Sequence, residues 1–224
     1  MKKAVIFDLD GTLTDTIESI KISADKAVGR FGFGPFTEDQ YKYFVGDGAA
    51  TLIERCLEAG GDKEHAFFEG AFAEYQRVFE EYCMYKVKPY EGIRELLVAL
   101  KEKGVKLAVL SNKPHERTKE VIHSIFGEDC FDEVRGQMAS VAKKPSPEGV
   151  YKILESFSMT ESGAVPFEPE DVLYLGDTGT DMQTGKAAGA FTIGALWGFR
   201  TEEELRENHA DAIIKNPMQL LDYL

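Results

Sequence analysis

Short, largely apolar segments recur along this chain, and each is followed directly, or after one glycine, by an aspartate or a serine. The clearest three cover residues 4–7, 105–110 and 172–175. Strands with apolar residues at nearly every position are typical of parallel sheets, because helices cover both faces of such sheets. Amphipathic helical patterns lie between the segments. We therefore expect an α/β core with a doubly wound, Rossmann-like parallel sheet.

The same two patterns predict the remaining elements of this core. Helices are expected over residues 92–103, 114–126, 147–157 and 180–188, and further strands over residues 191–194 and 212–214. Ser146 and Pro147 mark the start of the third of these helices, as its N-cap and its first helical residue.

One long segment breaks the alternation of strands and helices. Residues 15–88 show helical periodicity and no convincing strand. Helices are expected there over residues 15–31, 38–44, 49–59 and 63–85. Thr37 and Gln40 form a predicted capping box at the start of the second helix. The predicted domains are therefore an α/β core of residues 1–14 and 89–224 and an inserted all-helical domain of residues 15–88.

The composition of the chain disfavours several classes of binding partner. The chain has 26 Lys and Arg against 39 Asp and Glu, and its net charge of -13 repels nucleic acid and acidic membrane surfaces. Its 3 cysteines form no CxxC pair, so neither a disulfide framework nor a zinc cluster is expected. The uncharged run of residues 187–199 is shorter than the roughly 20 residues that span a bilayer, and the apolar stretch of residues 4–7 is too short for a signal peptide. We expect a cytoplasmic monomer or homodimer with no nucleic-acid or membrane partner.

The residues that follow the predicted strands point to a common site. In an open parallel sheet, ligands bind beyond the carboxyl ends of the strands. The residues at these ends are Asp8, Ser111 and Asp177, and Asp10 and Asp181 add two further acids close by. Side chains from three separate strands are therefore expected to converge on one crevice.

Such a cluster of carboxylates needs compensating charge. Two unit charges about 4 Å apart repel by about 4 kcal/mol at an effective dielectric constant of about 20, so several such pairs together are prohibitive. A hard cation with oxygen ligands, or protonation of one carboxyl group, would relieve the repulsion. The 4 histidines show no zinc-binding spacing. The sequence therefore predicts Mg2+ as the cofactor.

Each motif also has a purely structural interpretation when it is taken alone. The DG pair at Asp10 is common in turns, and Ser111 with Asn112 could cap the helix that follows them. Lys144 beside Lys143 could be a solvated basic pair. The combination of these signals in one chain is what favours a catalytic site.

Four segments resemble, in the same order, the four motifs of the haloacid dehalogenase superfamily. They are FDLDGTLTD at residues 7–15, SN at residues 111–112, KP at residues 144–145 and GDTGTD at residues 176–181. The first is similar to the DxDGT signature of the superfamily, and the resemblance covers the whole chain, including a helical insert after the first motif. With VGDG at residues 45–48, the pattern most resembles the phosphoglycolate phosphatase branch. The resemblance implies that the insert is a cap domain.

The resemblance also implies roles for the acidic residues. Asp8 would attack phosphorus and form an aspartyl-phosphate. Asp10 would protonate the leaving oxygen, activate water in the second step and offer its backbone carbonyl to Mg2+. Asp8, Asp10 and Asp177 would be the metal ligands, and Asp181 would order this shell from outside or through water.

A further set of residues would hold the substrate, according to the same resemblance. Ser111 and Lys144 would bind oxygens of the transferring phosphoryl group, and Lys144 would neutralise part of its charge. Thr12 and Asn112 belong to the same expected substrate-binding set. In the insert, Arg55 either meets a substrate carboxylate or faces solvent, and the sequence favours neither.

These roles together predict a magnesium-dependent phosphatase for a small phosphorylated metabolite such as phosphoglycolate. A phosphomutase of the same family is the alternative, and pyrophosphate or a nucleotide is an alternative substrate. A dehalogenase or a phosphonatase would be expected to lack the acid two residues after the nucleophile, whereas Asp10 is present. A binding protein without activity would have little reason to keep both acids, the lysine and the metal-site aspartate together.

Overall fold

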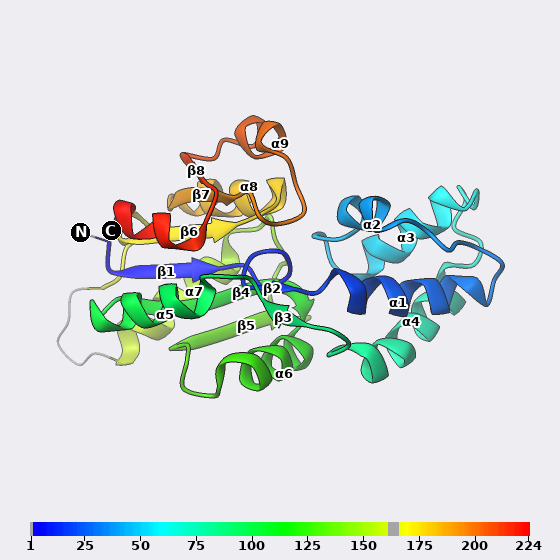
Figure 1. Cartoon of the computed structure of the whole chain (residues 1–224), viewed down its shortest axis with the longest axis horizontal. Helices are drawn as coiled ribbons and strands as arrows, with labels where there is room; N and C mark the ends of the chain where they lie inside the picture. The colour runs from blue at the N-terminus through cyan, green and yellow to red at the C-terminus, as the bar shows by residue number, and fades with distance from the viewer. Residues whose placement is uncertain (1, 161–165) are drawn as a thin grey trace. The chain divides into compact units, whose positions relative to one another are not determined.

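The computed structural model describes residues 2–160 and 166–224. The chain folds into two compact units. Residues Asp15–Lys88 form one unit, and the chain before and after this segment forms the other. The larger unit contains a six-stranded sheet, and the smaller unit is helical (Figure 1).

All neighbouring strands of the large sheet run parallel. Their spatial order is β5 (Glu133–Gln137), β4 (Lys106–Pro114), β1 (Ala4–Phe7), β6 (Val172–Gly176), β7 (Phe191–Ala195) and β8 (Ala212–Ile214). The prediction of a parallel α/β sheet is therefore confirmed. From β1 the chain builds β4 and β5 on one side and later β6, β7 and β8 on the other. The carboxyl end of β1 is thus the topological switch point, where open α/β sheets bind ligands.

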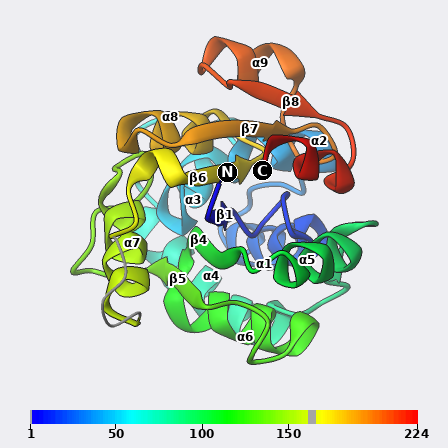
Figure 2. The ribbon, with the colours of Figure 1, turned by 90° about the vertical axis from the view of Figure 1, so that its left-hand side faces the viewer.

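Helices cover both faces of this sheet (Figure 2). One face carries α7 (Glu148–Thr160) and α8 (Gly179–Ala188), and the other carries α5 (Ile93–Glu102) and α6 (His115–Phe126). Ile6 of β1 belongs to the same buried cluster as Phe157 of α7. The neighbouring Phe7 makes an edge-to-face contact with the ring of Phe131. Burial on both faces explains why β1 has no polar residue before Asp8.

The smaller unit consists of four helices. They are α1 (Ile17–Gly29), α2 (Glu38–Phe44), α3 (Ala49–Ala59) and α4 (Phe68–Tyr82), and α1 packs against each of the other three. The predicted capping box is confirmed, because the Thr37 hydroxyl accepts the Gln40 N–H and the Gln40 side chain accepts the Thr37 N–H. Two short paired strands, β2 (Thr14–Asp15) and β3 (Lys88–Pro89), lie where the chain passes between the units.

Some elements carry too little apolar signal for prediction. β5 lies at the edge of the sheet with four of its five residues partly exposed, so its sequence EVRGQ has no apolar run. α9 (Glu202–Glu207) has one buried residue, Leu205, and shows no amphipathic stripe. Two 3-10 helices, η1 (Pro169–Asp171) and η2 (Pro217–Tyr223), are also present. Across the described residues, no helix combines the length and the apolar character needed to cross a membrane.

Most predicted bounds shift by a few residues, as in α7, which begins at Glu148 and not at Pro147, and two elements differ more. α4 begins at Phe68 and not at residue 63, because the Asp62 carboxylate accepts the N–H groups of the two residues before Phe68 and holds a turn there. β4 continues beyond the predicted end at residue 110, because Pro114 pairs with Gln137 of β5 after a register irregularity. The extension of β4 carries the Ser–Asn pair along the edge of the site.

Candidate active site

The loop after β1 is shaped around Gly11. Gly11 has a φ of +90°, and a Cβ atom there would lie 2.2 Å from an oxygen of Asp177, so no other residue fits without displacement. The backbone N–H groups of Leu13 and Thr14 both donate to the carbonyl oxygen of Leu9 and close the loop. The loop therefore lies directly against the residue that follows β6.

Three buried carboxylates meet at this edge of the sheet. Asp8 follows β1, Asp177 follows β6, and Asp181 lies in the first turn of α8. One oxygen from each lies within 4.8 Å of the other two. Asp181 Oδ2 accepts the N–H and the hydroxyl of Thr178 at 3.1 and 2.7 Å, a capping box that fixes the carboxylate.

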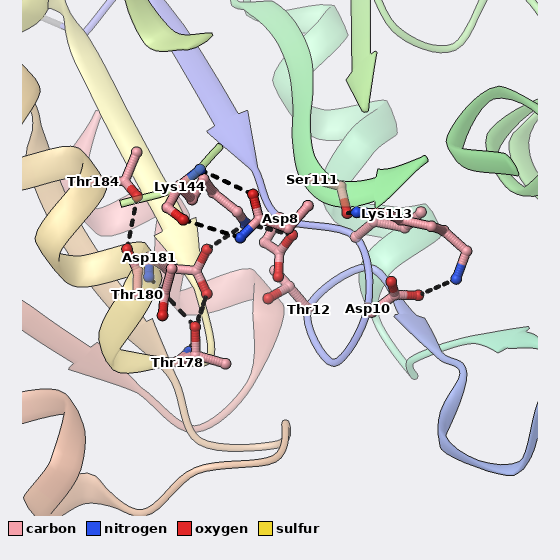
Figure 3. Close-up of polar contacts among 12 residues, drawn as sticks. Asp8, Asp10, Thr12, Ser111, Lys113, Lys144, Thr178, Thr180, Asp181 and Thr184 are labelled. Atoms are coloured by element: carbon pink, nitrogen blue, oxygen red, sulfur yellow. Dashed lines mark hydrogen bonds and ion pairs between the residues drawn. The ribbon is translucent and has the colours of Figure 1, made fainter. Parts of the chain in front are cut away.

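The ammonium group of Lys144 lies inside this cluster. Its Nζ is 2.8 Å from Asp8 Oδ1 and 2.7 Å from Asp181 Oδ1, and its side chain is 3% exposed (Figure 3). The side-chain amide of Asn112 fixes the Lys144 backbone, accepting its N–H at 2.9 Å and donating to its carbonyl at 3.2 Å. Asn112 on β4 thus sets the position of a lysine that contacts the carboxylate after β1.

The electrostatics of the cluster show an excess of negative charge. Burial, and next the charge of Asp181, raise the pKa of Asp8 well above its ordinary value. The same two causes raise the pKa of Asp177 to about 7. Burial disfavours the charge on Lys144, but the carboxylates of Asp181 and Asp8 outweigh it and raise the pKa of Lys144 well above its ordinary value. The ammonium group of Lys144 therefore does not offset the repulsion that acts on Asp8 and Asp177.

This donor set fits a hard divalent cation. All its ligand atoms are carboxylate oxygens, which Mg2+ and Ca2+ prefer. A bound cation would also offset the repulsion that raises the pKa values of Asp8 and Asp177. Among the residues that the structure describes, these three carboxylates are the acidic, histidine or cysteine side chains whose ligand atoms lie close enough together to hold one metal ion.

A second buried lysine lies on the other side of Asp8. Lys113 Nζ is 2.9 Å from Asp10 Oδ1, and the side chains of Lys113 and Asp10 are 3% and 18% exposed. The Lys113 N–H also donates to the hydroxyl oxygen of Ser111 at 3.2 Å. The motifs used in the sequence analysis do not include Lys113. The signal that could have found it is a lysine directly after the Ser–Asn pair at the end of a strand.

The residues predicted for the site all lie at this one edge of the sheet. They are Asp8, Asp10, Thr12, Ser111, Asn112, Lys144, Asp177 and Asp181. Besides Lys144, the expected substrate-binding residues Thr12 and Asn112 also contact other site residues. The Thr12 hydroxyl donates to Asp177 Oδ1 at 2.8 Å, and the Asn112 amide is engaged with the Lys144 backbone.

The predicted metal set and the three-carboxylate group overlap only in part. Asp181, expected outside the metal shell, lies within the group, whereas the carboxylate of Asp10 is not among its members. The expected role of Asp10 at a metal involves its backbone carbonyl and not this side chain. In the helical unit, Arg55 forms an ion pair with Asp47 and donates to the carbonyl oxygen of Phe44.

Comparison with known proteins identifies the class. The family model for haloacid dehalogenase-like hydrolases matches residues 5–195, and the chain belongs to this family. It is 34% identical over 219 residues to a phosphoglycolate phosphatase of Aquifex aeolicus, covering 98% of this chain and 95% of the relative. It is 30% identical over 229 residues to a phosphoglycolate phosphatase of Haemophilus influenzae, covering 99% and 98% of the two chains.

Solved structures share the fold over the full length of the chain. A crystal structure of a candidate phosphoglycolate phosphatase from Lactobacillus delbrueckii has a TM-score of 0.90 at 28% identity and covers 100% of this chain and 98% of its own. A predicted phosphatase from Clostridium acetobutylicum has a TM-score of 0.84 at 26% identity, with 100% and 98% covered. The helical insert α1–α4 is therefore part of the shared fold.

Proposed function

We propose that this chain is a magnesium-dependent phosphatase that hydrolyses small phosphomonoesters of the phosphoglycolate kind through an aspartyl-phosphate at Asp8. The observation that carries the proposal is the position of Asp8. Its carboxylate lies at the switch point of the sheet, contacts the Lys144 ammonium at 2.8 Å and has Asp10 two residues further along the same loop. The names of the relatives support the choice of substrate.

In the first step, a carboxylate oxygen of Asp8 attacks phosphorus, and the bond from phosphorus to the leaving oxygen breaks. Asp10 gives a proton to that oxygen, so the product leaves as an alcohol. Lys144 and the Ser111 hydroxyl hold the oxygens of the transferring group. Because Lys144 and Asp8 are already in contact, the phosphoryl group arrives beside a fixed positive charge.

In the second step, water attacks the phosphorus of the aspartyl-phosphate. Asp10 now takes a proton from this water, and the bond from phosphorus to the Asp8 oxygen breaks. Inorganic phosphate is released and the Asp8 carboxylate is restored. Asp10 thus acts as an acid and then as a base, and its partial exposure gives it access to the leaving group and to water.

Asp8, Asp177 and the backbone carbonyl of Asp10 would hold the magnesium ion, with Asp181 beside them. When bound, the ion would neutralise charge on the phosphoryl oxygens. Thr12 and the N–H of Phe199 hold the Asp177 carboxylate at 2.8 Å each and so orient it as a ligand. We propose that the helical unit Asp15–Lys88 acts as the cap domain that selects the leaving group.

A phosphate-release assay of the purified protein tests this function. The panel contains phosphoglycolate, other short phosphomonoesters, a sugar phosphate, a nucleotide and pyrophosphate, each with magnesium or with EDTA. We expect release from short phosphomonoesters that needs magnesium and that EDTA removes. Equal release in EDTA would contradict the metal requirement, and conversion of a sugar phosphate to its isomer without phosphate release would indicate a mutase.

A further inference from the structure

The pair of Lys113 and Asp10 gives the site a second buried cation. Lys144 is engaged with Asp8 and Asp181, where the transferring phosphoryl group is expected. Lys113 lies instead beside Asp10, the residue expected at the leaving oxygen. We propose that Lys113 binds a carboxylate on the leaving group and so selects phosphate esters of short hydroxy acids. This inference rests on the proposed function.

The backbone at Lys113 is fixed from several sides. Its N–H donates to the Ser111 hydroxyl oxygen at 3.2 Å, and its carbonyl accepts the Thr118 hydroxyl at 3.1 Å. Gly136 of β5 lies so close that a Cβ atom on it would be 2.6 Å from the Lys113 carbonyl oxygen. The ammonium group is therefore presented from a rigid strand, which is the arrangement that selective binding requires.

Burial makes this ammonium group depend on an anion. The Lys113 side chain is 3% exposed, and a charge removed from water to this extent is costly unless a partner of opposite charge contacts it. In the structure Asp10 Oδ1 is such a partner at 2.9 Å. When Asp10 turns to the leaving oxygen, a carboxylate on the substrate would take over part of this contact.

The distances expected around Asp10 suit a short substrate. With one Asp10 oxygen on Lys113 and the other on the leaving oxygen, two hydrogen bonds of about 2.8 Å each place the leaving oxygen on the order of 5 Å from the ammonium group. A carboxylate attached one carbon away from the leaving oxygen can bridge this gap. An alkyl group of the same size cannot offer the charge-assisted hydrogen bond.

Two substrates of equal length isolate the effect of the carboxylate. We would measure kcat/KM for 2-phosphoglycolate and for ethyl phosphate with the wild type, Lys113→Met and Lys113→Arg. Both kcat/KM values should fall in Lys113→Met, because Asp10 loses a contact. The ratio of the 2-phosphoglycolate value to the ethyl phosphate value should also fall, by about 100-fold. Lys113→Arg keeps the charge and should retain most of the ratio. Lys103→Met, which removes an exposed lysine after α5, should change neither rate.

The possible outcomes separate this inference from the proposed function. An equal loss on both substrates in Lys113→Met would overturn it, since Lys113 would then act only through Asp10. A wild type that hydrolyses both esters equally well would also overturn it, although the phosphatase assignment would stand. A wild type that releases phosphate from no ester would refute the proposed function itself. If Lys113→Met does not fold, as judged by circular dichroism, Lys113→Gln takes its place in the same comparison.

Discussion

Both units of the protein hold a cluster of charged side chains, half-buried in the helical unit and buried at the sheet edge, and the two clusters are balanced differently. In the helical unit, Asp25 of α1 accepts the Tyr41 hydroxyl at 2.8 Å and the Phe36 N–H at 3.1 Å, and it pairs with the Lys21 ammonium. One carboxylate there has three donors. At the end of β1, three carboxylates lie together, and the buried ammonium group of Lys144 pairs with two of them, Asp8 and Asp181.

We expect the difference in balance to separate a structural cluster from the proposed catalytic one. Burial raises the pKa of Tyr41, so its phenol stays protonated and serves Asp25 as a neutral donor. At the sheet edge, burial and like charge raise the pKa of Asp8 and Asp177, so their ionised forms are disfavoured. A fold keeps such repulsion where a cation or a reacting group will relieve it. Variants in each of the two clusters test this contrast.

The largest expected effect is that of Asp8→Asn. An amide cannot form the aspartyl-phosphate, so turnover should fall by about 10⁴-fold or more. The fold should be retained, and the melting temperature should be equal to or above that of the wild type, because one charge leaves a repulsive cluster. Phosphate release and thermal unfolding measure the two effects. Residual activity above about 1% of the wild type would contradict the role of Asp8 as the nucleophile, and loss of the fold would contradict the repulsion proposed for its cluster.

Lys144→Ala should have the next largest effect. Lys144 contacts both Asp8 and Asp181, and loss of one preorganised charge of this kind costs roughly 2 to 4 kcal/mol of transition-state stabilisation. Lys143→Ala removes the same formal charge from an exposed position one residue away and should cost far less. Values of kcat/KM at saturating magnesium compare the two. Equal losses of kcat/KM would mean that catalysis depends on the net positive charge of this segment and not on the contacts of Lys144.

A third effect is expected in the stability of the metal-free protein. Asp177 has a pKa of about 7 in the fold against an ordinary value of 3.8, so between these values the folded state binds more protons than the unfolded chain. The free energy of unfolding should therefore fall as the pH rises through this window, by roughly 2 kcal/mol between pH 5 and pH 7. Urea unfolding in EDTA measures this slope. Magnesium, or the variant Asp177→Asn, should flatten it, and a slope of opposite sign would contradict the charge excess.

The edge of the sheet that carries the site could be predicted from the strand pattern alone. Asp8 and Asp177 directly follow the apolar runs of β1 and β6, and parallel strands bring their carboxyl ends together. The helical insert could be predicted because strand patterns stop and helical periodicity continues there. β5 could not be predicted, because an edge strand with partly exposed residues needs no apolar run.

The hydrogen-bond partners of the site residues could not be predicted from the sequence. These contacts join segments far apart in the chain, as with the Asn112 side chain and the Lys144 backbone, 32 residues away. The Thr12 hydroxyl and Asp177 are separated by 165 residues. Lys113 has no motif of its own, and the role proposed for it rests on its burial beside Asp10. Spacing thus predicted where the site lies, whereas three-dimensional contacts were needed to find its positioning residues.

The smallest effect is expected in the balanced cluster. Asp25→Asn keeps an oxygen for the Tyr41 hydroxyl and the Phe36 N–H but removes the charge that Lys21 contacts. The free energy of unfolding should fall by about 1 to 2 kcal/mol, the usual cost of weakening a hydrogen bond to a charged group. The kcat/KM value should stay within about threefold of the wild type, because no group of the proposed chemistry changes.

An exposed aspartate on the next helix provides the matched control for this variant. Asp39 pairs with Lys42, but its side chain is 88% exposed, so Asp39→Asn should change the free energy of unfolding by less than about 0.5 kcal/mol. Urea unfolding and phosphate release on both variants complete the comparison. If Asp25→Asn were as inactive as Asp8→Asn while still folded, the cluster in the helical unit would belong to the function. Charge balance would then no longer separate the two sites, because a carboxylate with a balanced charge would be as necessary for turnover as one in a repulsive cluster.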